Sequence, residues 1–74
     1  MRFSINSRIF GRTDFWMPDN GGYIYKESEG YVGTQGSQIC EGGGFHGNTI
    51  SATPDTFEKE CRRWHRQRLR TREE

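Results

Sequence analysis

Long hydrophobic runs are missing from this sequence, and apolar residues of every kind are scarce. Only 30% of the 74 residues are hydrophobic, and the mean hydropathy is −1.04. No stretch is long and apolar enough to cross a bilayer, and nothing after Met1 resembles a signal peptide. We therefore expect a cytoplasmic protein that does not associate with membranes.

The shortage of apolar residues also limits the core that the chain can build. Residues 1–74 are enough for a single domain, near the lower limit of what folds without help. Five Phe, three Tyr and two Trp partly compensate, because each aromatic side chain can bury about 150–250 Å². Such a chain has no room for a large buried active site. We expect a non-enzymatic protein without catalytic residues, either a monomer or a dimer.

Cysteine and histidine are limited to two residues each: Cys40, His46, Cys61 and His65. In a chain without a secretion signal free thiols are expected, and free cysteine is usually buried. We therefore assign both cysteines to the core and expect no cofactor. Two alternatives remain open. One is a Cys40–Cys61 disulfide, and the other is a tetrahedral Zn²⁺ site made by all four residues, two of them four apart on a helix.

Glycine, by contrast, is abundant and is concentrated in the middle of the chain. Eight of the ten glycines lie within residues 21–44, and turn signals such as PDNGG and EGGGFHGN separate short stretches of strand-forming residues. These stretches are RFSIN, TDFWM, GYIYKE, SQIC and NTISAT. Short strands separated by Gly, Asn and Asp clusters are typical of an antiparallel sheet. Over residues 1–52 we predict four or five short antiparallel strands.

The strongest hairpin signal is the sequence DFWMPDNGGYIYK. Its PDNG centre suits a tight turn, because Pro fixes φ and Asn or Gly tolerates a positive φ. Alternation along the strands then divides the side chains between two faces. We expect four of them to lie in the core: Phe15, Met17, Tyr23 and Tyr25. Trp16 falls on the other face and is a candidate aromatic contact for a partner.

The clearest element is a C-terminal helix, which we predict over residues 53–72. Thr53 suits the N-cap, and Pro54 suits the first helical position. At 100° per residue, one narrow stripe of this helix contains Phe57, Cys61, Trp64 and Arg68. We expect the helix to pack this stripe across one face of the sheet, with Trp64 as its principal anchor. The predicted fold is therefore a small α+β domain.

Charge is distributed unevenly along the chain, although the net charge is only +1. Residues 1–60 carry five basic and eight acidic residues, whereas residues 61–74 carry six arginines and two glutamates. The basic residues gather on the helix face opposite the apolar stripe: Lys59, Arg62, Arg63, Arg66 and Arg70, with Arg72 extending the row. Like charges four apart on a helix destabilise it by about 0.2–0.5 kcal/mol per pair, so a row of them suggests a partner.

An anionic macromolecule is the partner that this row predicts, because the guanidinium group matches phosphate and carboxylate groups with two parallel hydrogen bonds. A protein or nucleoprotein target is favoured, because the acidic remainder of the chain would repel extended nucleic acid. Direct DNA or RNA binding is the alternative, although the sequence has no RNP octapeptide, KH loop or helix-turn-helix pattern. Small domains with one charged surface are common among accessory proteins of phages and mobile elements, which makes an inhibitor of a host nucleic-acid machine one form of this function.

Overall fold

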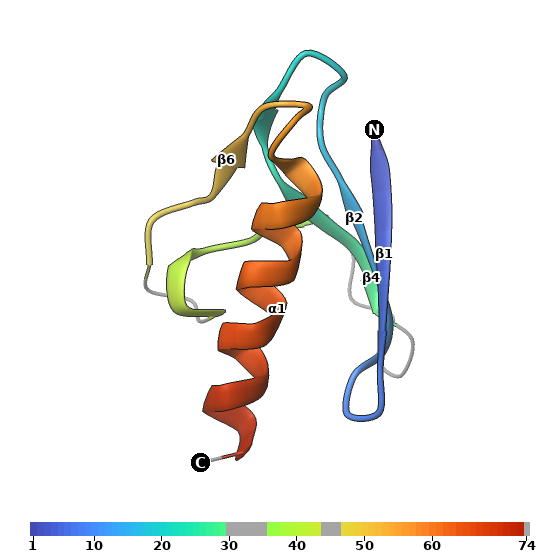
Figure 1. The fold of residues 1–74 in the computed structure, drawn as a ribbon, viewed down its shortest axis with the longest axis vertical. Helices are drawn as coiled ribbons and strands as arrows, with labels where there is room; N and C mark the ends of the chain where they lie inside the picture. Colours follow the sequence, from blue (N-terminus) through green and yellow to red (C-terminus); the bar gives the residue numbers. More distant parts are fainter. Residues whose placement is uncertain (30–35, 44–46, 74) are drawn as a thin grey trace.

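The computed structural model describes residues 1–29, 36–43 and 47–73 and confirms the predicted α+β fold. The strands are β1 (Arg2–Ser7), β2 (Gly11–Trp16), β3 (Gly22–Tyr23), β4 (Tyr25–Glu29), β5 (Ser37–Gln38) and β6 (Ser51–Ala52). A 3₁₀ turn, η1 (Glu41–Gly43), follows β5, and the helix α1 (Phe57–Glu73) ends the described chain. Figure 1 shows α1 lying across one face of the sheet that contains β1, β2 and β4.

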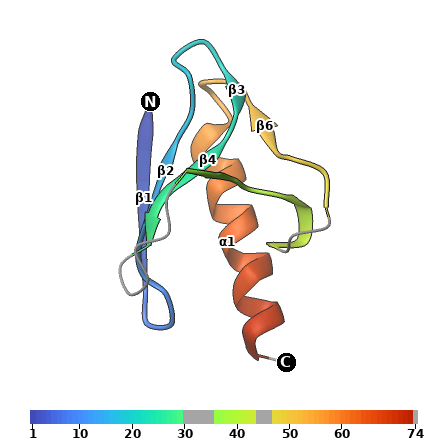
Figure 2. The same cartoon turned by 180° about the vertical axis from the view of Figure 1, so that it is seen from behind.

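The strands form two antiparallel sheets rather than one. The larger sheet has the order β1-β2-β4-β5, and β3 pairs with β6 in a separate two-stranded sheet. Viewed from behind, β1 forms one edge of the larger sheet, and β3 and β6 lie together near the start of α1 (Figure 2). The helix therefore covers one face of the larger sheet, and no described helix or strand covers the far face.

The β1–β2 hairpin follows from simple alternation. Its register is continuous from Arg2 opposite Trp16 to Ser7 opposite Gly11. Along β2, Thr13 and Phe15 are buried, while the alternating residues Arg12, Asp14 and Trp16 are more exposed. One irregularity interrupts the pairing of β2 with β4, between Asp14 and Phe15.

The PDNGG segment forms the predicted turn, and it shows why glycine is needed there. The backbone N–H of Gly21 donates to the carbonyl of Pro18 at 2.9 Å. Gly21 has a φ of 99°, which other residues rarely adopt, and a Cβ at this position would lie 2.9 Å from the carbonyl oxygen of Ala52. Any larger residue would separate this turn from the segment that leads into α1.

Three buried isoleucines join the two sheets. The backbone N–H of Ile24 donates to the carbonyl of Ile50, that of Ile50 to Ile39, and that of Ile39 to Ile24, at 2.9–3.1 Å. All three side chains enter the same core. This closed ring of hydrogen bonds satisfies the backbone where strands change partners, so the chain can turn without leaving buried polar groups unpaired.

The second arm of the hairpin turns its other face to the core, so two of the four predicted core residues are wrong. Phe15 and Met17 are buried as expected, but Tyr23 is 51% exposed and Tyr25 is only half-buried. Tyr25 lies opposite Trp16, which faces away from the core. Because side chains alternate along an extended chain, Tyr23 and Tyr25 then face outward and Ile24 faces inward.

The helix begins later than predicted. Residues 54–56 form a turn, in which the N–H of Thr56 donates to the carbonyl of Thr53 at 3.0 Å. The hydroxyl of Thr56 accepts a hydrogen bond from the N–H of Thr53 at 3.0 Å, which closes this turn from its other side. The first α-helical hydrogen bond runs from Glu60 to the carbonyl of Thr56 at 2.9 Å. Thr56, not Thr53, therefore stands at the start of α1.

The core lies between α1 and the sheets and is small. Trp64 is buried and meets the ring of Phe15 edge to face, with 5.7 Å between the ring centroids. The stripe predicted for the helix is therefore the face that packs. The buried apolar residues are Phe15, Met17, Ile24, Ile39, Ile50, Phe57, Cys61 and Trp64.

Candidate functional site

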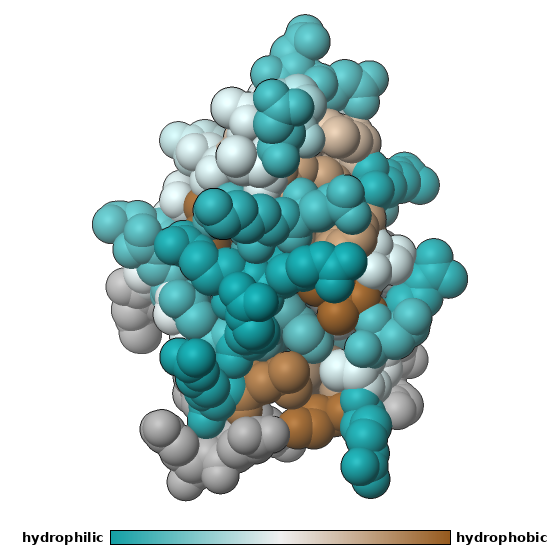
Figure 3. All heavy atoms as spheres, viewed as in Figure 1, coloured by the Kyte–Doolittle hydropathy of each residue, from teal (hydrophilic) through white to brown (hydrophobic). Residues whose placement is uncertain are grey.

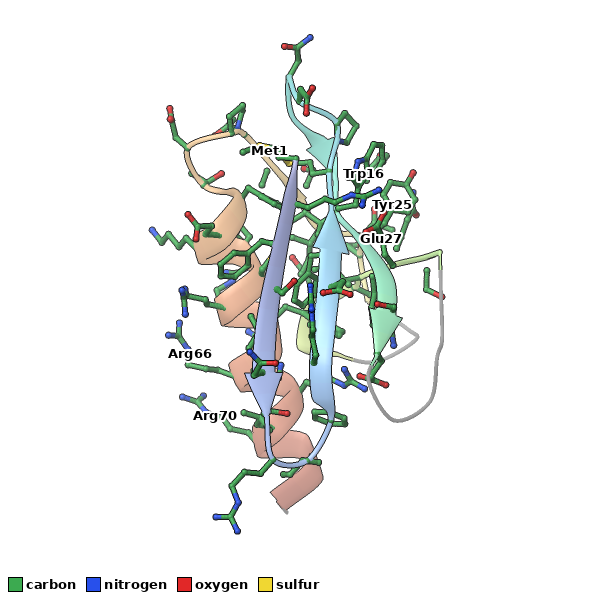
Figure 4. The ribbon with its side chains drawn as sticks, turned by 90° about the vertical axis from the view of Figure 1, so that its right-hand side faces the viewer. Met1, Trp16, Tyr25, Glu27, Arg66 and Arg70 are labelled. Carbon is green, nitrogen blue, oxygen red and sulfur yellow. The ribbon has the colours of Figure 1, made fainter. Side chains whose placement is uncertain are left out.

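The solvent-facing side of α1 is a cationic surface, which we call the arginine ridge. All of its described members are exposed: Lys59, Arg62, Arg63, Arg66 and Arg70. Figure 3 shows hydrophilic side chains gathered over this face of α1, and Figure 4 shows Arg66 and Arg70 pointing away from the sheet. Arg72 belongs to α1, but its side chain lies outside the described part of the structure.

Two ridge residues have contacts within the molecule. The guanidinium of Arg63 lies 3.0 Å from the carboxylate of Glu60, one helical turn earlier. The guanidinium of Arg62 lies over the ring of Phe3, 4.9 Å from its centre. This cation–π contact places Arg62 beside β1 but leaves its charge without a carboxylate among the described residues.

Arg66 and Arg70 have no carboxylate or aromatic partner within the described part of the chain, and both are exposed. The helix dipole stabilises the charge of only one of these two arginines. A cation in the last turn of a helix is stabilised by about 0.3–1 kcal/mol, and the effect falls off beyond that turn. Since α1 ends at Glu73, Arg70 benefits and Arg66 does not.

Basic residues on the strands are paired with acids instead. Arg12 contacts Asp14 at 2.8 Å, and Arg2 contacts Glu27 at 3.3 Å. The described strand arginines are thus paired with acids, whereas Arg66 and Arg70 on α1 have no acidic partner among the described residues. Arg8, in the turn after β1, is also exposed, and the neighbouring Phe10 contacts the C-terminal half of α1.

A buried charge cluster that the sequence did not predict lies under α1. Arg68 forms an ion pair with Glu29 at the end of β4, and Lys26 lies 3.9 Å from the same carboxylate. The side chains of Arg68 and Glu29 are only 15% and 5% exposed. Phe10 stacks beneath Arg68, 3.5 Å from ring centre to guanidinium carbon. The available signal was Arg68 itself, since a charge on an apolar stripe needs a buried partner.

The charges of this cluster shift the pKa values of its titratable groups. Burial alone would raise the pKa of Glu29, but the hydrogen bond and charge of Arg68 and the charge of Lys26 outweigh it and lower that pKa. Burial and the charge of Arg68 lower the pKa of His65, against an opposing effect of Glu29. The lowered pKa favours the neutral form of His65 next to Arg68.

The open face of the sheet carries the second candidate contact, Trp16. Its ring lies 5.7 Å from that of Tyr25, centroid to centroid, and Figure 4 shows both on the side opposite α1. Next to them, Asp14 accepts hydrogen bonds from Ser28 at 2.6 Å and from Ser4 at 2.5 Å. These bonds and Arg12 lower the pKa of Asp14 to about 2. The polar side chains of Ser4, Arg12, Asp14 and Ser28 on this face bond to one another, and the face lies on the other side of the molecule from Arg66 and Arg70 (Figure 4).

The four candidate zinc ligands are only partly described. Cys61 is buried. Burial and, to a smaller extent, the charges of Glu58 and Glu60 raise the pKa of its thiol to about 12, so the reactive thiolate form is disfavoured. Cys40 is half-buried and is not part of the core, contrary to the prediction, and both thiols are free. His46 lies outside the described residues. Within the described ranges no three His, Cys, Asp or Glu residues come together as a metal site, and the zinc hypothesis stays a prediction.

Family models, curated proteins and solved structures gave no match to this chain. Over the described residues, α1 lacks the length and apolar character that a bilayer span requires. The arginine ridge is thus characterised by its own geometry: an exposed row of guanidinium groups on a helix whose opposite side is fixed to the core by Trp64.

Proposed function

We propose that this chain is a non-enzymatic binding module that docks the arginine ridge on an anionic surface of a protein or nucleoprotein complex. One observation carries the proposal. Arg66 and Arg70 are exposed and have no partner among the described residues, whereas Arg2, Arg12 and Arg68 all contact carboxylates. Uncompensated arginines in a row on a rigid helix are a preorganised site for carboxylate or phosphate groups.

The distribution of acids favours a compact target over a long nucleic acid. Asp55 and Glu58 are exposed near the start of α1, and they would meet the phosphates of a duplex laid along the whole helix. The uncompensated guanidinium groups lie toward the other end. A protein that neutralises only three or four phosphates binds DNA weakly at physiological salt. An acidic patch on a protein, by contrast, can match the basic half of α1 without reaching the acidic half.

An inhibitor from a phage or mobile element, covering an acidic patch of a host nucleic-acid machine, is the biological form that we propose for this activity. The supporting features are the small size of the domain and the gathering on one helix face of arginines that lack an acidic partner among the described residues, while Arg2 and Arg12 on the strands are paired with acids. Binding of DNA or RNA phosphates by the same ridge is the competing outcome.

A pull-down from the source cell, with and without nuclease, tests the proposal. The ridge variant Arg66→Gln/Arg70→Gln is compared with a control, Ser37→Glu/Asn48→Glu, which changes the net charge equally at exposed positions away from the ridge. We expect a protein partner that survives nuclease, is lost with the ridge variant and is kept by the control. Loss of the partner on nuclease treatment would favour nucleic acid. Equal capture by both variants would show that the ridge is only a solvated face.

A further inference from the structure

The free edge of β1 is the longest unpaired strand edge in the described part of the chain. β1 has six residues and stands first in its sheet, whereas the opposite edge strand, β5, has two. Sheet edges are usually blunted by Pro, Lys, bulges or short strands. β1 contains neither Pro nor Lys, and its register with β2 is unbroken. A strand of this kind is open to pairing with another chain.

Backbone groups of alternate β1 residues point toward this open edge. Met1 and Met17 exchange both backbone hydrogen bonds, at 2.6 and 3.0 Å. Hydrogen-bonded and non-hydrogen-bonded pairs alternate along an antiparallel ladder, so the odd-numbered residues of β1 bond to β2. The N–H and C=O groups that face outward belong to the even-numbered residues: Arg2, Ser4 and Asn6.

The arginine ridge lies directly beside the edge. Phe3 and Ile5 of β1 are half-buried and pack against the core from the side that α1 covers. Figure 3 shows apolar side chains reaching the surface alongside the hydrophilic band over α1. The guanidinium of Arg62 lies over Phe3. One row of side chains on a strand added to β1 would therefore face Arg62.

The spacing of the ridge fits such a strand. The ring of Phe3 contacts Phe57 early in α1, and Phe10, beyond the end of β1, contacts His65 later in α1, so helix and strand run in the same direction. Residues four apart on a helix are separated by about 6 Å. Alternate residues of a strand are separated by about 6.6–6.8 Å. The spacing of alternate side chains on an added strand would therefore match the spacing of Arg62 and Arg66 along the helix.

On the basis of the docking proposed above, we propose that the partner binds as an extended acidic segment that adds a strand to the free edge of β1. Its backbone pairs with the outward-facing groups of β1, and carboxylates at alternate positions contact Arg62 and Arg66. A second copy of this chain fits less well, because pairing two β1 edges with the helices on the same side would bring two arginine ridges together.

A synthetic nine-residue peptide of alternating Thr and Glu is the probe for this mode. Asn6→Pro removes an outward N–H, and proline is tolerated on edge strands at such positions. Asn6→Ala, the matched control, removes the side chain and keeps the N–H. We expect Asn6→Pro to weaken peptide binding about tenfold relative to Asn6→Ala, through the lost backbone bond and the bulk of the ring. Melting temperatures of both variants show whether the fold is retained.

Amide hydrogen exchange of the unaltered protein gives a readout that needs no variant. Bound peptide should slow exchange at Ser4 and Asn6, whose amides face the edge, and a peptide with Lys in place of Glu should not. Absence of binding at millimolar peptide, or binding without this protection, would overturn strand addition. If Asn6→Pro binds as well as Asn6→Ala while the ridge variant loses its captured partner, strand addition is wrong and ridge docking stands.

Discussion

Replacing Arg68 with Met should destabilise the protein more than any other single change on the polar side chains of α1. Arg68 is mostly buried and paired with Glu29, which is 5% exposed. Removing one partner of a buried ion pair destabilises a protein by about 3–5 kcal/mol, because the other charge remains buried. Glu29 keeps Lys26 at 3.9 Å, which argues for the lower end of that range. The lost cation–π contact with Phe10 adds about 0.5–1 kcal/mol.

We therefore expect Arg68→Met to cost about 3–4 kcal/mol, a large part of the roughly 4–11 kcal/mol typical of a domain of this size. At about 4–8 °C per kcal/mol, the melting temperature should fall by at least about 12 °C. Arg70→Met is the matched control, since Arg70 is exposed and should change stability by no more than about 1 kcal/mol, the upper value of its helix-dipole contribution. Circular dichroism melts of both variants measure the difference. Equal melting temperatures would refute the buried-pair argument.

Further expectations follow from the same contacts. Trp64→Ala should destabilise the domain by about 3–5 kcal/mol and should largely unfold it in a melt followed by circular dichroism, whereas Tyr23→Ser should have little effect because Tyr23 faces solvent. The pKa of Asp14 is lowered to about 2, so the stability that its carboxylate contributes is fully present above the ordinary pKa of 3.8 and should be lost as the pH falls toward 2. In urea unfolding between these pH values, the free energy of unfolding of Asp14→Asn should therefore fall less than that of the wild type. A thiol reagent should label half-buried Cys40 before buried Cys61 in the native protein. If the purified protein contains one equivalent of zinc and unfolds when a chelator is added, the zinc site made by Cys40, His46, Cys61 and His65 is supported.

The fold was predictable from sequence where local signals decide it. Turn residues separated the strands, and the 3.6-residue period identified the face of α1 that contains Phe57 and Trp64. The placement of Tyr23 and Tyr25 was not predictable, because the whole segment between β2 and β4 sets which face of the second arm turns to the core. The start of α1 depends on a side-chain hydrogen bond of Thr56 that propensity does not reveal.

The candidate site was predictable to a similar degree. Helical periodicity alone brought the arginines of the ridge to one side. It could not show that Arg62 lies over Phe3, nor that Arg68 pairs with Glu29, because both contacts join segments far apart in the chain. Arg68 had been placed on the packed stripe from its position, but its partner came only from the tertiary structure.

Arginine-selective chemical modification of the complex, read by mass spectrometry, tests ridge docking most directly. Each arginine of the native chain is labelled with and without the captured partner, and Arg12, exposed on the opposite side of the molecule, serves as the internal reference. We expect the partner to protect Arg62, Arg66 and Arg70 from modification and to leave Arg12 reactive. Unchanged labelling of Arg66 and Arg70 in a saturated complex would contradict the proposed docking surface.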